Sequence, residues 1–467
     1  MTRPAALSLQ GLTLTITWAV ETFSISIVSG RYIDLSSFHQ LRNLTWRGPG
    51  PENLNTLSDV VRNNSAHLRK LELDFVNRFI VFNYDADATD FSDDSDDSDN
   101  SDVQDETENT RVSRKRSVFA SVVLRLNHHP QRPLFRNICV LSLTQVPLSA
   151  YMAGAFNFDT LESLTLRMCS WWDIFLVRVM QLNLPINLRA FEIVEDSDIA
   201  FEWGDGIISD FLNAFGGLEE LCVSQTGPAP ALDLWDILGR RHPTLKRFVH
   251  HQRSNEIDDV FQRPTDLPDL AVVGSDMRRI KEDPSRNPLT KLGLEFIGLA
   301  CIPARLKYLL LPFTSKTSLK AIHIRQTRYD RLSFGSWAAV HDNPPLLSGA
   351  GNDTSSDSDL STSTDDEPLG PNVGHIEGWR RRVLSREFSH FAEWAFGPRG
   401  IPSLDVIVFG DFSYGGRLFG NLMISRNMDG TGNSRVIEEG EYEWNEVLDK
   451  YGTMMEACPE EELFDLV

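Results

Sequence analysis

Cysteine is scarce in this chain of 467 residues, and long apolar runs are missing. The five cysteines, at positions 139, 169, 222, 301 and 458, include no C-x-x-C pair, which argues against a disulfide framework and a zinc site. No run of about 18 or more apolar residues predicts a membrane span. Serine, glutamine and threonine interrupt the apolar residues of 1–20, which disfavours a signal peptide. A reducing compartment, cytoplasmic and/or nuclear, is therefore expected.

Motifs that indicate catalysis are missing as well. The sequence contains no H-E-x-x-H, G-x-S-x-G, G-x-x-x-x-G-K-[ST] or G-x-G-x-x-G. The adjacent histidines His250 and His251, like His128 and His129, have no cysteine or carboxylate at ligand spacing, which favours structural or surface roles. We therefore predict no catalytic residue, no metal and no cofactor. An unrecognised enzyme and a secreted ligand-binding repeat protein are the alternatives.

Basic charge is lacking in the two places where acidic charge is concentrated. Residues 85–110 carry twelve acids and residues 353–367 carry six, with no lysine or arginine in either. These eighteen account for most of the formal net charge of −21, so the remainder of the chain is close to neutral. A partner with a nucleic-acid backbone is disfavoured, because no broad basic field is present.

Both acidic segments have the composition of disordered chain. Residues 85–116 are rich in serine and aspartate and end in a basic cluster, while residues 343–374 are rich in serine, threonine, proline and glycine. Such segments bury too little apolar surface to offset their ordering entropy, so two disordered inserts are predicted. Four residues precede an acid by three positions and are candidate phosphorylation sites: Ser356, Thr362, Ser363 and Thr364. A solubilising spacer is the alternative.

The rest of the chain repeats one short apolar pattern. Residues 161–169 read L-x-x-L-x-L-x-x-C, and Leu164 and Leu166 alternate with polar Thr165 and Arg167. This alternation predicts a strand with one buried face. Copies of the pattern place their second apolar residue at 12, 44, 71, 141, 164, 191, 221, 248, 292, 322 and 407. Most of these are 23 to 32 residues apart, close to the period of leucine-rich repeats.

Helical apolar spacing lies between several of these strands. It predicts helices over residues 52–64, 207–215, 232–241, 306–311 and 379–396. Alternating strands and helices predict an α/β leucine-rich-repeat solenoid over residues 1–435, a curved horseshoe with parallel strands on the concave face and helices on the convex face. The acidic residues 436–467 are predicted to form a C-terminal cap or tail.

The side chains between the leucines point to the concave face, which is predicted to bind an unknown protein ligand. The predicted partner-binding residues are Lys70, Glu72, Asp74, Thr165, Arg167, Glu192, Cys222, Ser224, His251, His323 and Arg325. Cys169, the last residue of the motif, is interpreted as a small buried hydrophobe. No concentrated catalytic constellation is expected on this mixed surface.

The divergent L-x-x-L-x-L repeats and the block at 394–417 resemble fungal F-box/leucine-rich-repeat proteins, over most of residues 36–435. In that family an N-terminal F-box binds the Skp-type adaptor of a cullin ubiquitin ligase, and the repeats hold the substrate. The resemblance implies a substrate-recognition subunit. Residues 1–40 lack the Leu-Pro start and the helical spacing of an F-box, so adaptor binding is expected only of a longer form. A general scaffold or regulatory interaction protein unconnected to ubiquitin is the alternative.

Overall fold

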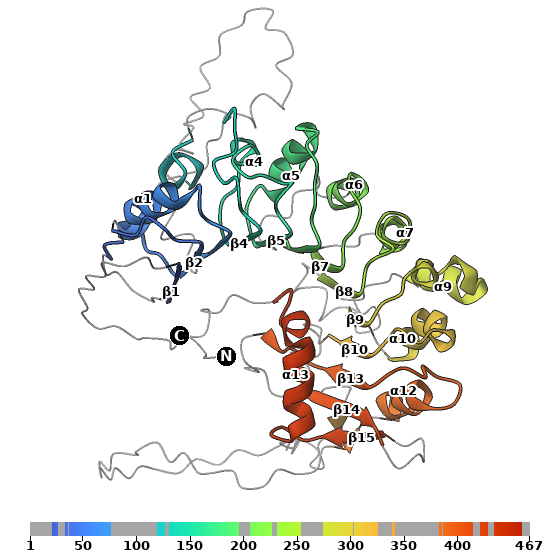
Figure 1. The fold of residues 1–467 in the computed structure, drawn as a ribbon. Helices are drawn as coiled ribbons and strands as arrows, with labels where there is room; N and C mark the ends of the chain where they lie inside the picture. The colour runs from blue at the N-terminus through green and yellow to red at the C-terminus, as the bar shows by residue number, and fades with distance from the viewer. Residues whose placement is uncertain are drawn as a thin grey trace, which may run out of the picture.

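The chain forms a curved, solenoid-like stack of strands with helices along its outer side (Figure 1). The computed structural model describes residues 21–26, 33–35, 37–75, 119–126, 130–195, 206–226, 231–253, 274–301, 303–325, 339–340, 383–384, 386–413, 421–427 and 434–459. Both predicted acidic inserts, the four candidate phosphorylation sites and the predicted repeat around Leu12 lie outside the described residues.

One sheet of thirteen strands runs through the described part of the stack. Its strands, in spatial order, are β1 (Thr22–Ser26), β2 (Asn43–Arg47), β3 (Lys70–Asp74), β4 (Val140–Thr144), β5 (Ser163–Arg167), β6 (Ala190–Val194), β7 (Glu220–Thr226), β8 (Arg247–Arg253), β9 (Phe296–Leu299), β10 (Ala321–Ile324), β13 (Val406–Phe409), β14 (Leu422–Arg426) and β15 (Ser434–Ile437). All neighbours from β1 to β13 are parallel, whereas β14 and β15 are antiparallel to the strands before them. The short strands β11 (Ala339–Val340) and β12 (Val383–Leu384) form a separate antiparallel pair.

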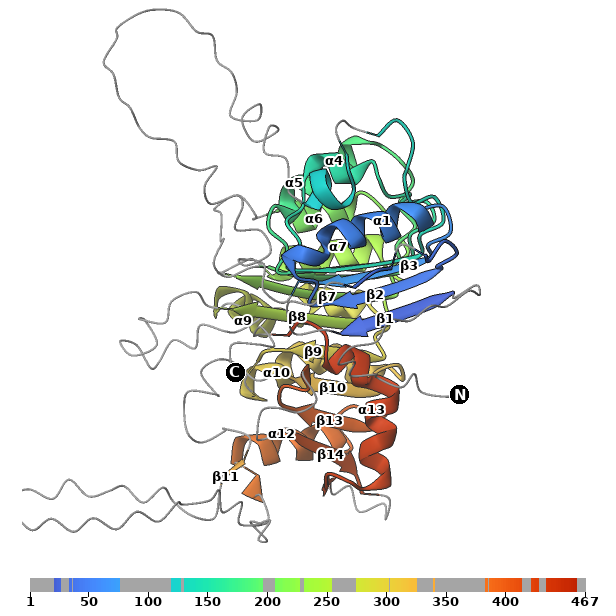
Figure 2. The same ribbon diagram turned by 90° about the vertical axis from the view of Figure 1, so that its left-hand side faces the viewer.

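The helices lie on the outer side of the sheet, with one exception on the inner side (Figures 1 and 2). The outer α-helices are α1 (Leu54–Asn64), α4 (Ala150–Ala153), α5 (Trp172–Gln181), α6 (Ile207–Asn213), α7 (Ala231–Arg241), α9 (Gly274–Glu282), α10 (Pro303–Leu310) and α12 (Arg386–Phe396). Short turns of 3₁₀ or π helix are η1 (Pro51–Asn53), η4 (Phe119–Val123), η6 (Pro284–Arg286), η7 (Pro288–Lys291) and η8 (Leu311–Ser315). The inner helix is α13 (Tyr442–Met455). Because helices need more width than strands, this arrangement curves toward the strands.

The repeated leucines stack in register inside the core. Leu44 pairs with Leu71, Leu71 with Leu141, and Leu141 with Leu164, and all four are fully buried. Each buried leucine contributes about 1.5–3 kcal/mol relative to an exposed one. Nine of the eleven predicted repeat positions lie within strands of the sheet, so most of the predicted strand pattern is confirmed.

The predicted strand around Leu292 is wrong. The strand β9 begins at Phe296, and its Ile297 pairs with Phe248 on one side and Ile322 on the other. Leu292 instead follows the turn η7, which Asn287 caps by accepting a hydrogen bond from the N–H of Leu289 at 3.1 Å. Residues 289–294 and 294–299 both read as the repeat, and the proline-initiated turn decides between the two frames.

The predicted helices differ from the observed ones mainly at one end. Helix α12 begins at Arg386 rather than 379, because Val383 lies in β12, paired with Val340 of β11. Helices α1, α6, α7 and α10 lie within the ranges predicted for them or begin a few residues earlier. Apolar spacing therefore placed five helices of the outer layer, whereas α4, α5 and α9 were not predicted.

Backbone hydrogen bonds join successive repeats just before each strand. The carbonyl oxygen of Glu162 accepts the N–H groups of Arg189 at 2.8 Å and Ala190 at 3.0 Å. The same paired arrangement recurs at the carbonyls of Glu21, Arg42, Arg69, Cys139, Arg189, Glu219, Lys246, Glu295 and Lys320. These bonds use main-chain atoms only, so they hold the repeats together while the side chains diverge.

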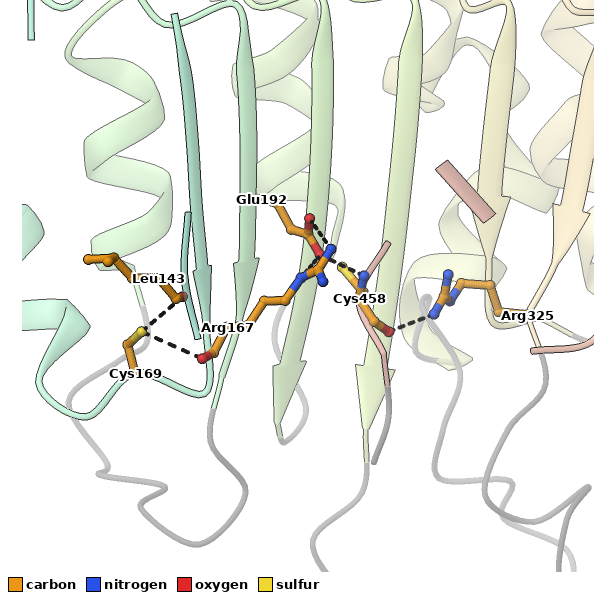
Figure 3. A network of polar contacts seen from close by, with 6 residues as sticks. All are labelled: Leu143, Arg167, Cys169, Glu192, Arg325 and Cys458. Carbon is orange, nitrogen blue, oxygen red and sulfur yellow. Dashed lines mark hydrogen bonds and ion pairs between the residues drawn. The ribbon is translucent and has the colours of Figure 1, made fainter. Parts of the chain in front are cut away.

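Cys169 is buried, as predicted, and also connects two repeats. Its thiol donates to the carbonyl oxygen of Leu143, one repeat earlier, with an Sγ–O distance of 3.2 Å (Figure 3). This hydrogen bond satisfies the carbonyl oxygen of Leu143 near the end of strand β4. All five cysteines carry thiols rather than disulfides.

Candidate functional site

The inner face of the sheet has two chemically different halves. Residues on β2 to β5 that alternate with the core are mostly polar and half-buried, and we call them the polar strip: Asn43, Thr45, Arg47, Lys70, Glu72, Asp74, Ser142, Thr144, Ser163, Thr165 and Arg167. From β6 onward the inward positions are largely apolar and buried, and these residues form the covered half: Val194, Cys222, Val249, Phe296, Ala321, Val406, Val408 and Met423. A face whose inward positions become apolar must itself be covered.

Helix α13 and the residues after it provide that cover. The helix lies across the inner side of the last strands (Figures 1 and 2), and its buried face packs on the covered half. The ring of Trp444 lies 6.1 Å from Phe412, and the ring of Tyr451 lies 5.5 Å from Phe296, measured between ring centroids. The segment expected to form a cap or tail therefore occupies the inner face of the sheet.

Polar side chains from distant strands hold the end of this segment through its backbone (Figure 3). Glu192 on β6 accepts the N–H of Cys458 at 2.8 Å, and Arg325, just after β10, donates to the carbonyl of Cys458 at 2.7 Å. Arg167 on β5 binds both oxygens of Glu192, at 2.8 and 2.9 Å, and orients the carboxylate. Cys458 has φ of 54°, a left-handed conformation that a non-glycine residue adopts only when its surroundings impose it.

Burial acts on the pKa values of three groups in and beside this network. Burial alone would lower the pKa of Arg167, but the charge and hydrogen bonds of Glu192 raise it above its ordinary value. Burial raises the pKa of Asp74 despite the nearby guanidinium groups of Arg47 and Arg167. Burial also raises the pKa of the Cys222 thiol, which therefore stays protonated and is not an activated nucleophile.

Two fully buried histidines are held neutral at physiological pH. Burial, with the charge of Arg325, lowers the pKa of His323 to about 3, and its Nε2–H donates to the carbonyl of Gly410 at 2.8 Å. Burial lowers the pKa of His250 to about 3 as well, and its Nδ1 accepts the indole N–H of Trp235 at 3.1 Å. Neither ring has the near-neutral pKa that suits a general acid or base.

The predicted partner-binding residues separate into two groups in the structure. Six are half-buried, on the polar strip or at its border: Lys70, Glu72, Asp74, Thr165, Arg167 and Glu192. Five are at most 5% exposed and lie on the side of the sheet that the C-terminal segment covers: Cys222, Ser224, His251, His323 and Arg325. The prediction of an open concave surface is therefore corrected for these five, because they are buried. Cys222 packs in the cluster that contains α13 and Cys458, Arg325 donates to the carbonyl of Cys458, and His323 lies against the rings of Phe296 and Phe412. The apolar inward residues Val194, Val249 and Phe296 were the sequence signal for this cover.

The polar strip carries paired charges of both signs. Arg47 lies 3.2 Å from Asp74, and Lys70 lies 3.0 Å from Glu72. The hydroxyl of Thr45 donates to Glu72 at 2.8 Å. These side chains span neighbouring strands and are partly solvated, so they can exchange partners with an arriving ligand at little cost.

A shallow hollow lies at the edge where the middle strands begin. It is lined by Cys139, Asp159, Thr160, Glu162, Asn187, Leu188, Arg189, Gly216 and Gly217. No group of three or more histidine, cysteine or acidic side chains in the described ranges could hold a metal ion. Within those ranges, no helix combines the length and apolar character needed to cross a bilayer. The chain matches no family model, no curated protein and no solved structure.

Proposed function

We propose that this protein is a non-enzymatic protein-binding solenoid that holds a partner on the polar strip of β2 to β5. The observation that carries this proposal is the division of the inner face. One half already holds a peptide segment of the chain itself, while the adjoining half presents polar, half-buried side chains over several parallel strands. Neighbouring positions with hydrogen-bonding side chains of both signs suit recognition of a mixed protein surface.

The partner chemistry follows from the pairs on the strip. Arg47 and Lys70 can each turn from their intramolecular carboxylate to one on a partner, leaving Asp74 and Glu72 for its basic or amide groups. The partner proposed is therefore a protein segment with alternating acidic and basic or amide side chains. A uniformly charged ligand would leave half of the strip unpaired.

Substituting the strip tests the proposal. Glu72→Lys and Thr165→Lys place like charges beside Lys70 and Arg167, whereas Asp233→Lys on the exposed side of α7 is a matched control on the outer layer. The tagged full chain and its variants are compared by quantitative affinity purification. A partner lost by about tenfold or more with both strip variants, and retained with the control, supports the proposal. Recovery of the same proteins with all variants refutes it.

The finer proposal is a leucine-rich-repeat protein that acts as a substrate-recognition subunit of a cullin ubiquitin ligase. Its support is the repeat spacing and the resemblance of residues 36–435. Mass spectrometry of the proteins that co-purify with the tagged chain tests it. Recovery of subunits of a cullin ligase supports the ligase role, and a different stable partner without them leaves the general scaffold as the role of the strip.

A further inference from the structure

The covered half recognises its peptide segment in a way that does not require this particular sequence. Glu192 accepts the backbone N–H of Cys458, and Arg325 donates to its backbone carbonyl. Apolar contacts come from one face of α13, at Trp444 and Tyr451 and at the methionines Met454 and Met455, and from Ala457 and Cys458 after the helix. Backbone hydrogen bonds with apolar anchors at positions i, i+7, i+10 and i+11 constitute a helix-in-groove binding mode.

Helix α13, which fills the site, is weakened by a glycine in its interior. Gly452 lies inside α13, and a Cβ added there would meet no atom within 4 Å, so packing does not require the glycine. Glycine in a helix interior is about fivefold less favourable than alanine. The helix is joined to β15 through a short turn at Gly440, where φ is 96°. The segment can therefore leave the face without unfolding the strands.

The occupied site also leaves buried polar atoms unsatisfied. Ser224 Oγ, His323 Nδ1 and Arg325 Nη1 have no hydrogen-bond partner among the described residues, and these three side chains are at most 3% exposed. Buried polar atoms without partners disfavour the state that contains them. A segment offering acceptors to Ser224 and Arg325 and a donor to His323 would fit this face better than residues 442–458 do.

We propose that the covered half is a receptor for an amphipathic helix of a partner protein, which displaces residues 442–458 from it. The partner helix carries large apolar or aromatic anchors at i, i+7, i+10 and i+11, with polar groups directed at Ser224, His323 and Arg325. This inference shares with the proposed function only the sheet on which the polar strip and the covered half both lie. Binding on the polar strip does not require release of α13, so either proposal can fail alone.

Competition between the chain's own segment and a peptide tests the inference. The probe is a fluorescent synthetic peptide of residues 438–459 with Cys458→Ser, and its binding to the full chain is measured by anisotropy. Trp444→Ala weakens the resident helix, so the peptide should bind this variant at least about tenfold more tightly than the wild-type chain. Tyr442→Ala is the matched control, because Tyr442 is 73% exposed on the same helix; it should bind like wild type.

Gly452→Ala keeps the test decisive if Trp444→Ala folds poorly, and thiol labelling of a folded Trp444→Ala chain shows where the peptide binds. The alanine strengthens the resident helix, so peptide affinity should fall by about fivefold. In the Trp444→Ala chain, Cys222 should react with a maleimide, and the bound peptide should protect it, since Cys222 lies beneath the segment. Equal affinity for wild type, Trp444→Ala and Gly452→Ala, or peptide binding that leaves Cys222 unprotected, overturns the inference.

Discussion

Acidification should destabilise the protein through the buried ring of His323. The neutral ring donates from Nε2 to the carbonyl of Gly410, between the rings of Phe296 and Phe412 and beside Arg325. Its pKa of about 3 in the folded chain lies below the ordinary value of 6.5. A depressed pKa means that the stability it contributes is present above pH 6.5 and is lost as the pH falls from 6.5 toward 3.

The size of this effect follows from the difference between the two pKa values. At 1.36 kcal/mol per pH unit, lowering the pH from 7 to 5 should cost about 2 kcal/mol of unfolding free energy through His323. His250, with the same shift, should contribute a similar amount. The measurement is urea unfolding at both pH values, followed by tryptophan fluorescence and circular dichroism.

A matched variant isolates the contribution of His323 from that of the carboxylates. His323→Gln keeps an amide that can donate to the Gly410 carbonyl but does not titrate. The loss of stability between pH 7 and pH 5 should be about 2 kcal/mol smaller in this variant than in the wild-type chain. If both chains lose the same amount, His323 is not held neutral by burial and the argument is refuted.

Two further predictions concern the backbone and the core, and both are measured by denaturant unfolding. Gly410→Ala should lower the free energy of unfolding by about 3 kcal/mol, because φ is 125° and the added Cβ would overlap the side chain of Asn421 and lie 3.0 Å from its Cα. Gly440→Ala, with open space around it, should lower the free energy of unfolding by only about 1 kcal/mol. Leu164→Ala should lower the free energy of unfolding by about 2–5 kcal/mol, because it leaves a cavity in the stack. Thr165→Ala, on the other face of the same strand, should change the free energy of unfolding by no more than about 0.5 kcal/mol. Equal losses within either pair would contradict the assignment of the two glycines or of the two strand faces.

Most strands and five of the outer helices could be predicted from the sequence because their signals are local. Leu164 and Leu166 alternate with Thr165 and Arg167 within a single strand, so five residues suffice to assign both faces. The register near Leu292 could not be decided from the apolar pattern, since two overlapping frames satisfy it. The choice depends on the cap that Asn287 provides to the following turn and on pairing with strands before and after it.

The position of the C-terminal segment was beyond local reasoning for a different reason. The bond between Glu192 and Cys458 joins residues 266 positions apart, and no periodicity connects them. The sequence did place Glu192 and Arg325 on the inner face, and that placement matches the strand parity. Their partner could not be inferred, because their role depends on which part of the chain covers Val194 and Val249.

The covering of the inner face by the last helix has a consequence for synthesis of the chain. At about 5–20 residues per second, roughly 13–55 seconds separate the translation of β6 from that of Cys458. During this interval the apolar inward residues of β6 to β9 are exposed to solvent. The nascent chain therefore exposes an apolar surface until residues 442–458, or another segment that binds in their place, cover it.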